Sequence, residues 1–141
     1  MREQPTVPST EKTSKSVLLV EDNPLLRESL SDYFARRRWH LTAVGTADEA
    51  FGLVGRGALY DVVLTDIVMP GRLDGIDLAR CILQERPTAR VIVMSGYTAK
   101  AAELDEVVSK GARFLRKPFR LRELDAVIAG LLDAGNAEGR Q

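Results

Sequence analysis

The sequence predicts a doubly wound α/β fold, in which five helices flank a five-stranded parallel sheet with the strand order 2-1-3-4-5. Two observations support this prediction. Short apolar runs, typical of strands buried on both faces, recur along the chain, and an amphipathic helical pattern follows each of them. Regular alternation of strand and helix gives a parallel sheet with right-handed crossovers, and 141 residues are enough for one such domain.

The first half of the chain contains two strand and two helix patterns after a polar segment. Residues 1–15 are polar and contain two prolines, which indicates a flexible tail. Asn23 and Pro24 are typical of a helix start, and Thr46-Ala-Asp-Glu49 is a capping box that starts another helix. The predicted elements are a strand over 17–20, a helix over 24–38, a strand over 40–44 and a helix over 47–55.

The second half contains three further units of strand and helix. The predicted elements are a strand over 61–65, a helix over 75–85, a strand over 91–94, a helix over 98–109, a strand over 112–115 and a helix over 121–133. Pro87 ends the first of these helices, and Gly111 closes the second. Residues 134–141 are small and polar, so we expect a C-terminal tail there and a folded domain over 16–133.

The composition argues against several classes of protein. Basic and acidic residues both number 20, so there is no overall field to attract nucleic acid or an anionic membrane. No apolar run is long enough to span a bilayer, and the N-terminus shows no secretory signal. A single cysteine, Cys81, suits a reducing compartment. We therefore expect a cytoplasmic protein that binds neither nucleic acid nor membrane.

Three carboxylates are expected to meet at one edge of the sheet. Glu21 and Asp22 follow the first predicted strand, and Asp66 follows the third. In the strand order 2-1-3-4-5 these two strands are neighbours, and the carboxyl ends of such strands form the ligand site. Because three carboxylates in one cleft repel each other, either one is protonated or a cation is present. Hard oxygen ligands with open positions favour Mg²⁺.

Two more polar residues are predicted to reach the same edge. Ser95 ends the fourth strand, and Lys117 follows the fifth. Taken singly, each of these residues has a simpler explanation as a turn hydroxyl or a surface lysine. Together with the acids they supply a metal, an ammonium and a hydroxyl around Asp66, which is the charge stabilisation that phosphoryl transfer to a carboxylate needs.

These residues lie in segments that resemble a known family. The segments are VLLVEDNPLLR at 17–27, DVVLTDIVMPGRLDGIDL at 61–78, VIVMSGY at 91–97 and GARFLRKPFR at 111–120. The chain resembles the receiver domain of two-component response regulators, the CheY-like family, whose fold is flavodoxin-like. The resemblance covers about residues 16–133, nearly everything except the tails.

The resemblance implies a chemical role for each residue of the cluster. Asp66 is expected to accept a phosphoryl group from a phosphohistidine on a histidine kinase or a phosphotransfer protein. Asp22, Asp66 and the backbone carbonyl of Val68 are expected to bind Mg²⁺, with Glu21 acting directly or through water. Lys117 is expected to contact the phosphoryl oxygen.

The resemblance also implies a conformational switch. Ser95 is expected to move toward the phosphoryl group while Phe114 rotates inward, and the Lys117–Pro118 peptide bond is expected to be cis. The surface formed by the helix over 98–109, the strand over 112–115 and the helix over 121–133 then changes and is read by a downstream protein.

The sequence departs from the commonest family pattern in three places. Phe114 stands where tyrosine is frequent, so the switch ring has no hydroxyl. Gly71-Arg72-Leu73 lengthens the loop after Asp66 by one residue relative to the chemotaxis protein, and this loop and the Ser-Gly-Tyr sequence are similar to receivers of hybrid histidine kinases. No further domain follows the last helix, so we expect a single-domain regulator.

Two positions are predicted to control the lifetime of the phosphoryl group. In the family, the residues two beyond the phosphorylated Asp and two beyond the Ser/Thr flank the path of the hydrolytic water. Here they are Val68 and Tyr97, and neither carries an acid or an amide that would orient water. The hypothesis is slow autodephosphorylation.

Three other functions fit parts of the pattern. A degenerate receiver would only scaffold partners without phosphorylation, but Asp66, Lys117 and the acid pair are all present. An Mg²⁺-dependent aspartyl phosphohydrolase usually has a second Asp two residues after its nucleophile, where this chain has Val68. A flavin mononucleotide carrier would place its phosphate after the first strand, where the acids would repel it. A phosphorylation-dependent binding module that is not an enzyme remains the prediction.

Overall fold

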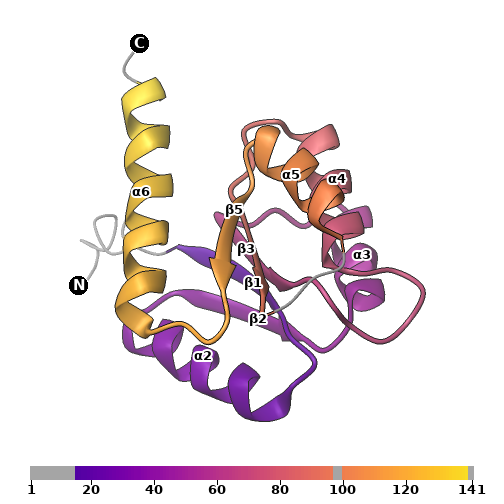
Figure 1. Ribbon diagram of the computed structural model, residues 1–141. Helices are drawn as coiled ribbons and strands as arrows, with labels where there is room; N and C mark the ends of the chain where they lie inside the picture. Colours follow the sequence, from indigo (N-terminus) through magenta and orange to yellow (C-terminus); the bar gives the residue numbers. More distant parts are fainter. Residues whose placement is uncertain (1–14, 97–99, 140–141) are drawn as a thin grey trace, which may run out of the picture.

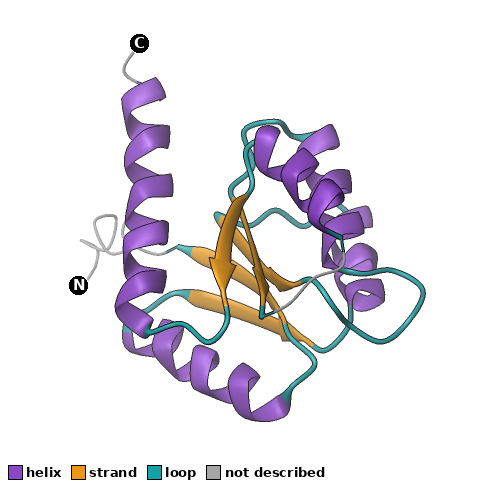
Figure 2. Ribbon diagram, in the orientation of Figure 1, coloured by secondary structure: helices purple, strands orange, loops and turns teal. Residues whose placement is uncertain are grey.

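The computed structural model describes residues 15–96 and 100–139 and confirms the predicted fold class. Five strands form one parallel sheet in the order β2-β1-β3-β4-β5, with helices on both faces (Figures 1 and 2). The elements are β1 (Ser16–Val20), α2 (Pro24–Arg36), β2 (His40–Val44), α3 (Ala47–Gly55), β3 (Val62–Asp66), α4 (Gly75–Glu85), β4 (Val91–Ser95), α5 (Ala101–Ser109), β5 (Arg113–Arg116) and α6 (Leu121–Gly139).

The sheet separates two hydrophobic layers. Helices α2 and α6 cover one face, while α3, α4 and α5 cover the other (Figure 1). The three central strands are buried on both sides, which explains why they lack the polar alternation of half-exposed strands. The largest buried side chains of the first layer, Leu30 and Phe34 of α2 and Leu124 of α6, pack against alternate residues of these strands.

The predicted helix starts are confirmed. The Asn23 side chain accepts hydrogen bonds from the N–H groups of Leu25 and Leu26, and Pro24 is the first helical residue of α2. At the start of α3, the Thr46 hydroxyl accepts from the Glu49 N–H. These caps fix where each chain segment leaves the sheet, and so fix the strand ends that carry the polar residues.

Several predicted boundaries are corrected by the structure. Strand β3 ends at Asp66, one residue later than expected. The Ile67 N–H still donates to the Met94 carbonyl of β4, so the pairing of the two strands continues to that point. Strand β5 is likewise shifted to Arg113–Arg116. Helix α2 ends at Arg36, before the last two of the three arginines.

Two helices also differ from their expected lengths. Helix α5 begins at Ala101, where the Lys100 side chain makes no capping hydrogen bond, and residues 98 and 99 of the predicted helix lie outside the described residues. Helix α6 continues beyond 133 to Gly139 and projects past the sheet (Figure 1). The apolar period stops near Leu132, but no proline follows to stop the backbone, so the end of the pattern was a poor indicator of the end of the helix.

The predicted N-terminal tail lies outside the described residues except for Lys15, whose carbonyl accepts from the His40 N–H beside β1. Among the helices of the described ranges, none combines the length and the apolar character that crossing a membrane requires.

Candidate functional site

The structure brings the three predicted carboxylates together at the carboxyl ends of β1 and β3. One oxygen from each of Glu21, Asp22 and Asp66 lies within 4.8 Å of the others. Glu21 is 0% exposed and Asp66 is 8% exposed, whereas Asp22 faces solvent. The register of the sheet explains this juxtaposition, because Val20 pairs with Thr65 and each strand delivers its acid directly afterwards.

Lys117 joins the two buried acids. Its Nζ donates to Glu21 Oε1 and to Asp66 Oδ2, and both distances are 3.0 Å. The lysine is positioned by the sheet, since its backbone N–H donates to the Ser95 carbonyl beyond the end of β5. The predicted cis peptide bond between Lys117 and Pro118 is confirmed. The predicted convergence of lysine and acids is therefore correct.

Three hydrogen bonds hold Glu21 in place, two at its backbone and one at its side chain. Its N–H donates to the Val44 carbonyl, and its own carbonyl accepts from Arg27 Nη1 at 2.8 Å. Glu21 Oε2 accepts from the Asn23 N–H at 3.0 Å. Because Glu21 Oε1 accepts from Lys117, both carboxylate oxygens of Glu21 accept hydrogen bonds within the protein, and the side chain is held in one position in the site.

The backbone of Asp66 is held by a close approach to helix α4. Gly75, the first residue of α4, donates its N–H to the Ile67 carbonyl at 2.9 Å, and the Thr65 hydroxyl donates to the Asp66 carbonyl. A Cβ on Gly75 would lie 1.9 Å from that same Asp66 carbonyl oxygen. Because no side chain can occupy this space, the contact fixes the end of β3 against the start of α4.

The pKa values reflect the crowding of these charges. Burial raises the pKa of Asp66 above its ordinary 3.8, and the Lys117 ammonium opposes this shift only in part. Burial also raises the pKa of Glu21 above 4.5, against its hydrogen bonds to the Asn23 N–H and Lys117. Burial alone would lower the pKa of Lys117, but the two carboxylates outweigh it and raise that pKa above 10.5. The cluster therefore retains an excess of negative charge that favours a further cation.

The donor set fits a hard divalent cation. Carboxylate oxygens suit Mg²⁺, which keeps several of its waters and so needs few protein ligands. Lys117 donates to Oδ2 of Asp66, and the Asp22 carboxylate is exposed to solvent. Asp22 and Asp66 are therefore the residues best able to ligate Mg²⁺ directly, with Glu21 behind them.

The remaining predicted site residues are placed as follows. Ser95 is buried at the end of β4, and Phe114 is exposed on β5. Val68 is exposed on the loop that follows Asp66. Tyr97 lies outside the described residues, so its place in the site stays a prediction.

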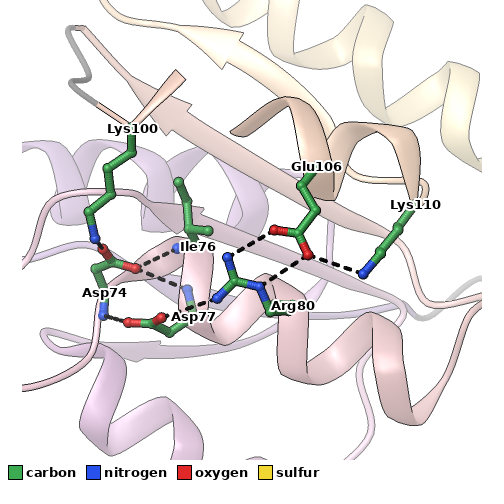
Figure 3. A network of polar contacts seen from close by, with 7 residues as sticks. All are labelled: Asp74, Ile76, Asp77, Arg80, Lys100, Glu106 and Lys110. Atoms are coloured by element: carbon green, nitrogen blue, oxygen red, sulfur yellow. Dashed lines mark hydrogen bonds and ion pairs between the residues drawn. The ribbon is translucent and has the colours of Figure 1, made fainter. Parts of the chain in front are cut away.

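A polar network that the sequence did not reveal links helices α4 and α5 beside the site (Figure 3). Asp74 caps α4, accepts from the N–H groups of Ile76 and Asp77, and forms an ion pair with Lys100. Further along, Arg80 pairs with Asp77 and with Glu106 of α5, and Lys110 also pairs with Glu106. The network thus ties the helix that supports Asp66 to the residue that precedes α5.

Sequence reasoning missed Gly75 and Asp74 as supports of the site. The sequence predicts only that a helix begins at residue 75. An Asp before a Gly, with Asp77 three residues after it, is a capping signal that could have been recognised. The close approach of Gly75 to the Asp66 carbonyl depends on how β3 and α4 pack, and no local pattern indicates it.

Comparison with known proteins places this geometry in a family. The response regulator receiver domain profile matches residues 17–129. The transcriptional activator protein PfeR of Pseudomonas aeruginosa is 40% identical over 119 residues, which cover 84% of this chain and 38% of PfeR. The response regulator receiver protein CpdR of Brucella abortus is 32% identical over 120 residues, which cover 85% of this chain and 98% of CpdR. The chain therefore spans less than half of PfeR but nearly all of CpdR.

Solved structures give the same result. A response regulator receiver protein from Sinorhizobium medicae superposes with a TM-score of 0.74 at 27% identity, covering 86% of this chain and 96% of that protein. The response regulator protein TrrA of Thermotoga maritima, solved in complex with Mg²⁺ and BeF, superposes with a TM-score of 0.71 at 26% identity, covering 83% of this chain and 98% of that protein.

Proposed function

The chain belongs to the response regulator receiver family of two-component signalling, and we propose that it works by accepting a phosphoryl group on Asp66 and thereby switching a partner-binding surface. One observation supports this proposal above the others: the Lys117 Nζ lies 3.0 Å from Asp66 Oδ2 and 3.0 Å from Glu21 Oε1, at the edge where three carboxylates meet. This puts a fixed cation beside Asp66, the aspartate that is buried among the described residues.

In the proposed reaction, a carboxylate oxygen of Asp66 attacks the phosphorus of a phosphohistidine. The P–O bond to Asp66 forms as the P–N bond breaks, and the electron pair of that bond returns to the imidazole of the donor. Lys117 is already in place to neutralise the charge on the transferred group, so little reorganisation is needed during the reaction. The donor would be a histidine kinase or a phosphotransfer protein.

Asp22, Asp66 and the Val68 carbonyl would hold Mg²⁺, and Glu21 would act as a direct ligand or through a water molecule. Mg²⁺, when bound, would neutralise charge on the phosphoryl oxygens. The Mg²⁺ and BeF bound to TrrA support this assignment by analogy. The Glu21 carboxylate, held by the Asn23 N–H and Lys117, would keep the lysine aimed at Asp66.

The output of the proposed switch is a rearrangement around Ser95 and Phe114. Ser95 would hydrogen-bond the phosphoryl group, and the exposed Phe114 ring would rotate inward. The Lys117 N–H bond to the Ser95 carbonyl already couples the two strands on which these residues lie. The face formed by α5, β5 and α6 would carry the change to a downstream protein in the cytoplasm.

Beryllofluoride, which mimics a phosphoryl group on a carboxylate, tests this proposal. We expect ¹⁹F NMR to show one bound fluoride environment with the wild type in the presence of Mg²⁺, and none with Asp66→Asn or without the metal. Binding that does not depend on Mg²⁺, or that survives Asp66→Asn, would overturn the proposed site. An Asp133→Asn variant, which alters an exposed carboxylate on α6, is the matched control and is expected to bind like the wild type.

Slow autodephosphorylation is expected because Val68 and Tyr97 offer nothing to orient water. Introducing an orienting side chain, Val68→Asn or Tyr97→Glu, is expected to shorten the phosphoryl half-life about tenfold. The measurement is decay of the phosphorylated protein on a phosphate-affinity gel after removal of the donor. A half-life that neither substitution changes would show that these two positions do not control hydrolysis.

A further inference from the structure

An apolar cavity lies away from the carboxylate cluster, on the face of the sheet that α3, α4 and α5 cover. Helices α3 and α4 lie side by side there (Figure 1), and the cavity lies between their C-terminal ends. Its volume is about 330 Å³. Val63, near the start of β3, and Ala89, before β4, form part of its wall. The cavity is therefore at the opposite end of these strands from Asp66, and the phosphoryl-acceptor site does not account for it.

The cavity exists because small residues end α3 and turn the chain toward β3. Gly55 is the last residue of α3, and Gly57 adopts φ 93° while its N–H donates to the Val54 carbonyl. Both glycines line the cavity, and no atom lies within 4 Å of the position that a Cβ would take at either one. Ala58 and Cys81 add two more small side chains to the wall. The sequence thus leaves open a space that larger side chains would fill.

The wall of the cavity is apolar and contains two aromatic rings. The lining side chains that pack in or against the core on this face of the sheet include Phe51, Val54, Tyr60, Val63 and Ile82. Small-molecule sites in proteins are mostly apolar, with volumes from about 300 to 1,000 Å³. A cavity of about 330 Å³ has room for one aromatic ring system, which Phe51 and Tyr60 suit because aromatic rings pack favourably against each other.

Two side chains of opposite charge lie at the solvent side of the cavity. Glu85 ends α4 and Arg86 follows it, and both residues are exposed and line the cavity. Neither side chain forms an ion pair with a residue in the described part of the chain. A few polar groups beside an apolar pocket fix the orientation of a ligand. A ligand that carries both a carboxylate and an ammonium would satisfy both charges at once.

We propose that this cavity binds a small zwitterion with an aromatic side chain, the chemistry of a free aromatic amino acid. The ring would contact Phe51 and Ile82, the carboxylate would pair with Arg86, and the ammonium would pair with Glu85. The proposal does not rest on phosphorylation of Asp66, because the residues that line the cavity do not include a member of the carboxylate cluster.

The surroundings favour a small molecule over a protein segment. A protein interface needs an apolar surface that extends beyond a single cavity. Of the large apolar side chains that the described surface exposes, only Leu59 lines the cavity. The exposed residues near the ends of α3 and α4 include Arg56 and Gln84, which are polar. Apart from the cavity itself, the apolar surface available to a partner here is therefore small.

Four probes that share an indole ring test the proposal on the full chain. They are tryptophan, a zwitterion; tryptamine, a cation; indole-3-acetate, an anion; and indole, which is neutral. Binding is measured by ligand-observed NMR titration. We expect tryptophan to bind with a Kd at or below about 1 mM, the affinity that about 15 non-hydrogen atoms give at an ordinary ligand efficiency. Tryptophan is expected to bind about tenfold more tightly than indole, because only tryptophan pairs with both charges.

Gly55→Met and Gly52→Met are a matched pair of variants that locate the site. Both glycines are exposed on α3, and the nearest atom to a Cβ at Gly52 is Arg56 Nη1 at 4.0 Å, but only Gly55 lines the cavity. Gly55→Met fills part of the cavity and is expected to weaken tryptophan binding at least about tenfold. Gly52→Met is expected to leave it within about twofold. Urea denaturation is expected to show that both variants are as stable as the wild type.

Two charge variants test the orientation of the ligand. Glu85→Gln is expected to weaken binding of tryptophan and tryptamine about threefold without weakening that of indole-3-acetate. Arg86→Gln is expected to weaken tryptophan and indole-3-acetate by a similar factor without weakening tryptamine. This crossed pattern is expected only if the two side chains contact opposite charges of the same ligand.

Cys81 gives an independent readout at the cavity, because it is the only cysteine of the chain and lines the wall. Tryptophan is expected to slow the alkylation of Cys81 by iodoacetamide, followed by intact-mass spectrometry. The protection is expected in the wild type and in Gly52→Met, and it should be lost in Gly55→Met.

The proposal would be overturned if tryptophan did not bind, if indole bound as tightly as tryptophan, or if Gly55→Met left tryptophan binding unchanged. A dimer seen by light scattering that Gly55→Met abolishes would assign the cavity to a second copy of the chain instead. Asp66→Asn is expected to bind tryptophan like the wild type, so the outcome for the phosphoryl-acceptor site and the outcome for this cavity are separate.

Discussion

Replacing Gly75 with alanine is expected to destabilise the fold by about 3 kcal/mol. The added Cβ would lie 1.9 Å from the Asp66 carbonyl oxygen and 2.8 Å from its carbonyl carbon. Both are backbone atoms, so no side-chain rotation can relieve the overlap, and either β3 or α4 must shift. The free energy of unfolding is measured by urea denaturation. Because the shift displaces Asp66, beryllofluoride binding is expected to weaken in the same variant.

Gly55→Ala is the matched control. Gly55 ends α3, and no atom lies within 4 Å of the position that its Cβ would take. Alanine there is expected to be neutral or to stabilise the protein by up to about 1 kcal/mol, because alanine favours the helix. If Gly75→Ala cost no more than Gly55→Ala, the close approach between α4 and the end of β3 would not be a constraint on the site.

Replacing Lys117 with methionine is expected to destabilise the protein by about 3 kcal/mol at neutral pH without divalent cations. The substitution keeps an unbranched apolar stem but removes the ammonium between Glu21 and Asp66. Two buried carboxylates would then be left without a counter-ion. Mg²⁺ is expected to recover part of the loss, since a ligand that binds only the folded state stabilises it.

The loss in Lys117→Met is expected to depend on pH in a defined direction. The pKa values of Asp66 and Glu21 are raised in the folded protein, so the stability that these groups contribute is present below their ordinary values of 3.8 and 4.5 and is lost as the pH rises through the folded values. Removing the ammonium raises both pKa values further. The difference between wild type and variant should therefore be small near the lower of these values and grow toward neutral pH.

Lys110→Met provides the comparison for this prediction. Lys110 pairs with Glu106 at 3.1 Å, but both side chains are largely solvent-exposed, so the loss is expected to stay below about 1 kcal/mol. The free energy of unfolding of both variants and of the wild type is measured by urea denaturation from acid to neutral pH, first in EDTA and then with Mg²⁺. A loss in Lys117→Met that is independent of pH would contradict the electrostatic explanation.

The fold and the core of the site could be predicted because they depend on local and topological rules. Buried apolar runs identified the strands, and the strand order then required Glu21, Asp22 and Asp66 to share an edge. Lys117 and Ser95 followed from the same rule. Each of these residues ends a strand or follows one within two residues, and a strand end is visible in the sequence.

The supports of the site could not be predicted because they depend on tertiary packing. The approach of Gly75 to Asp66 and the bond from Arg27 to the Glu21 carbonyl join elements whose separation no sequence period encodes. The links between α4 and α5, including Asp74 with Lys100, are of the same kind. The extension of α6 to Gly139 could not be predicted for a different reason. The helix continues through polar residues after the last residue of its apolar face, and the prediction relied on that face.

The central claim, that Asp66 accepts a phosphoryl group, is tested most directly by intact-mass spectrometry after incubation with acetyl phosphate and Mg²⁺. We expect one adduct of about 80 Da on the wild type, the mass added when a carboxylate nucleophile becomes an acyl phosphate. The adduct should require Mg²⁺ and should be absent from Asp66→Asn. An adduct of the same size on Asp66→Asn, or one that forms equally well in EDTA, would contradict the claim.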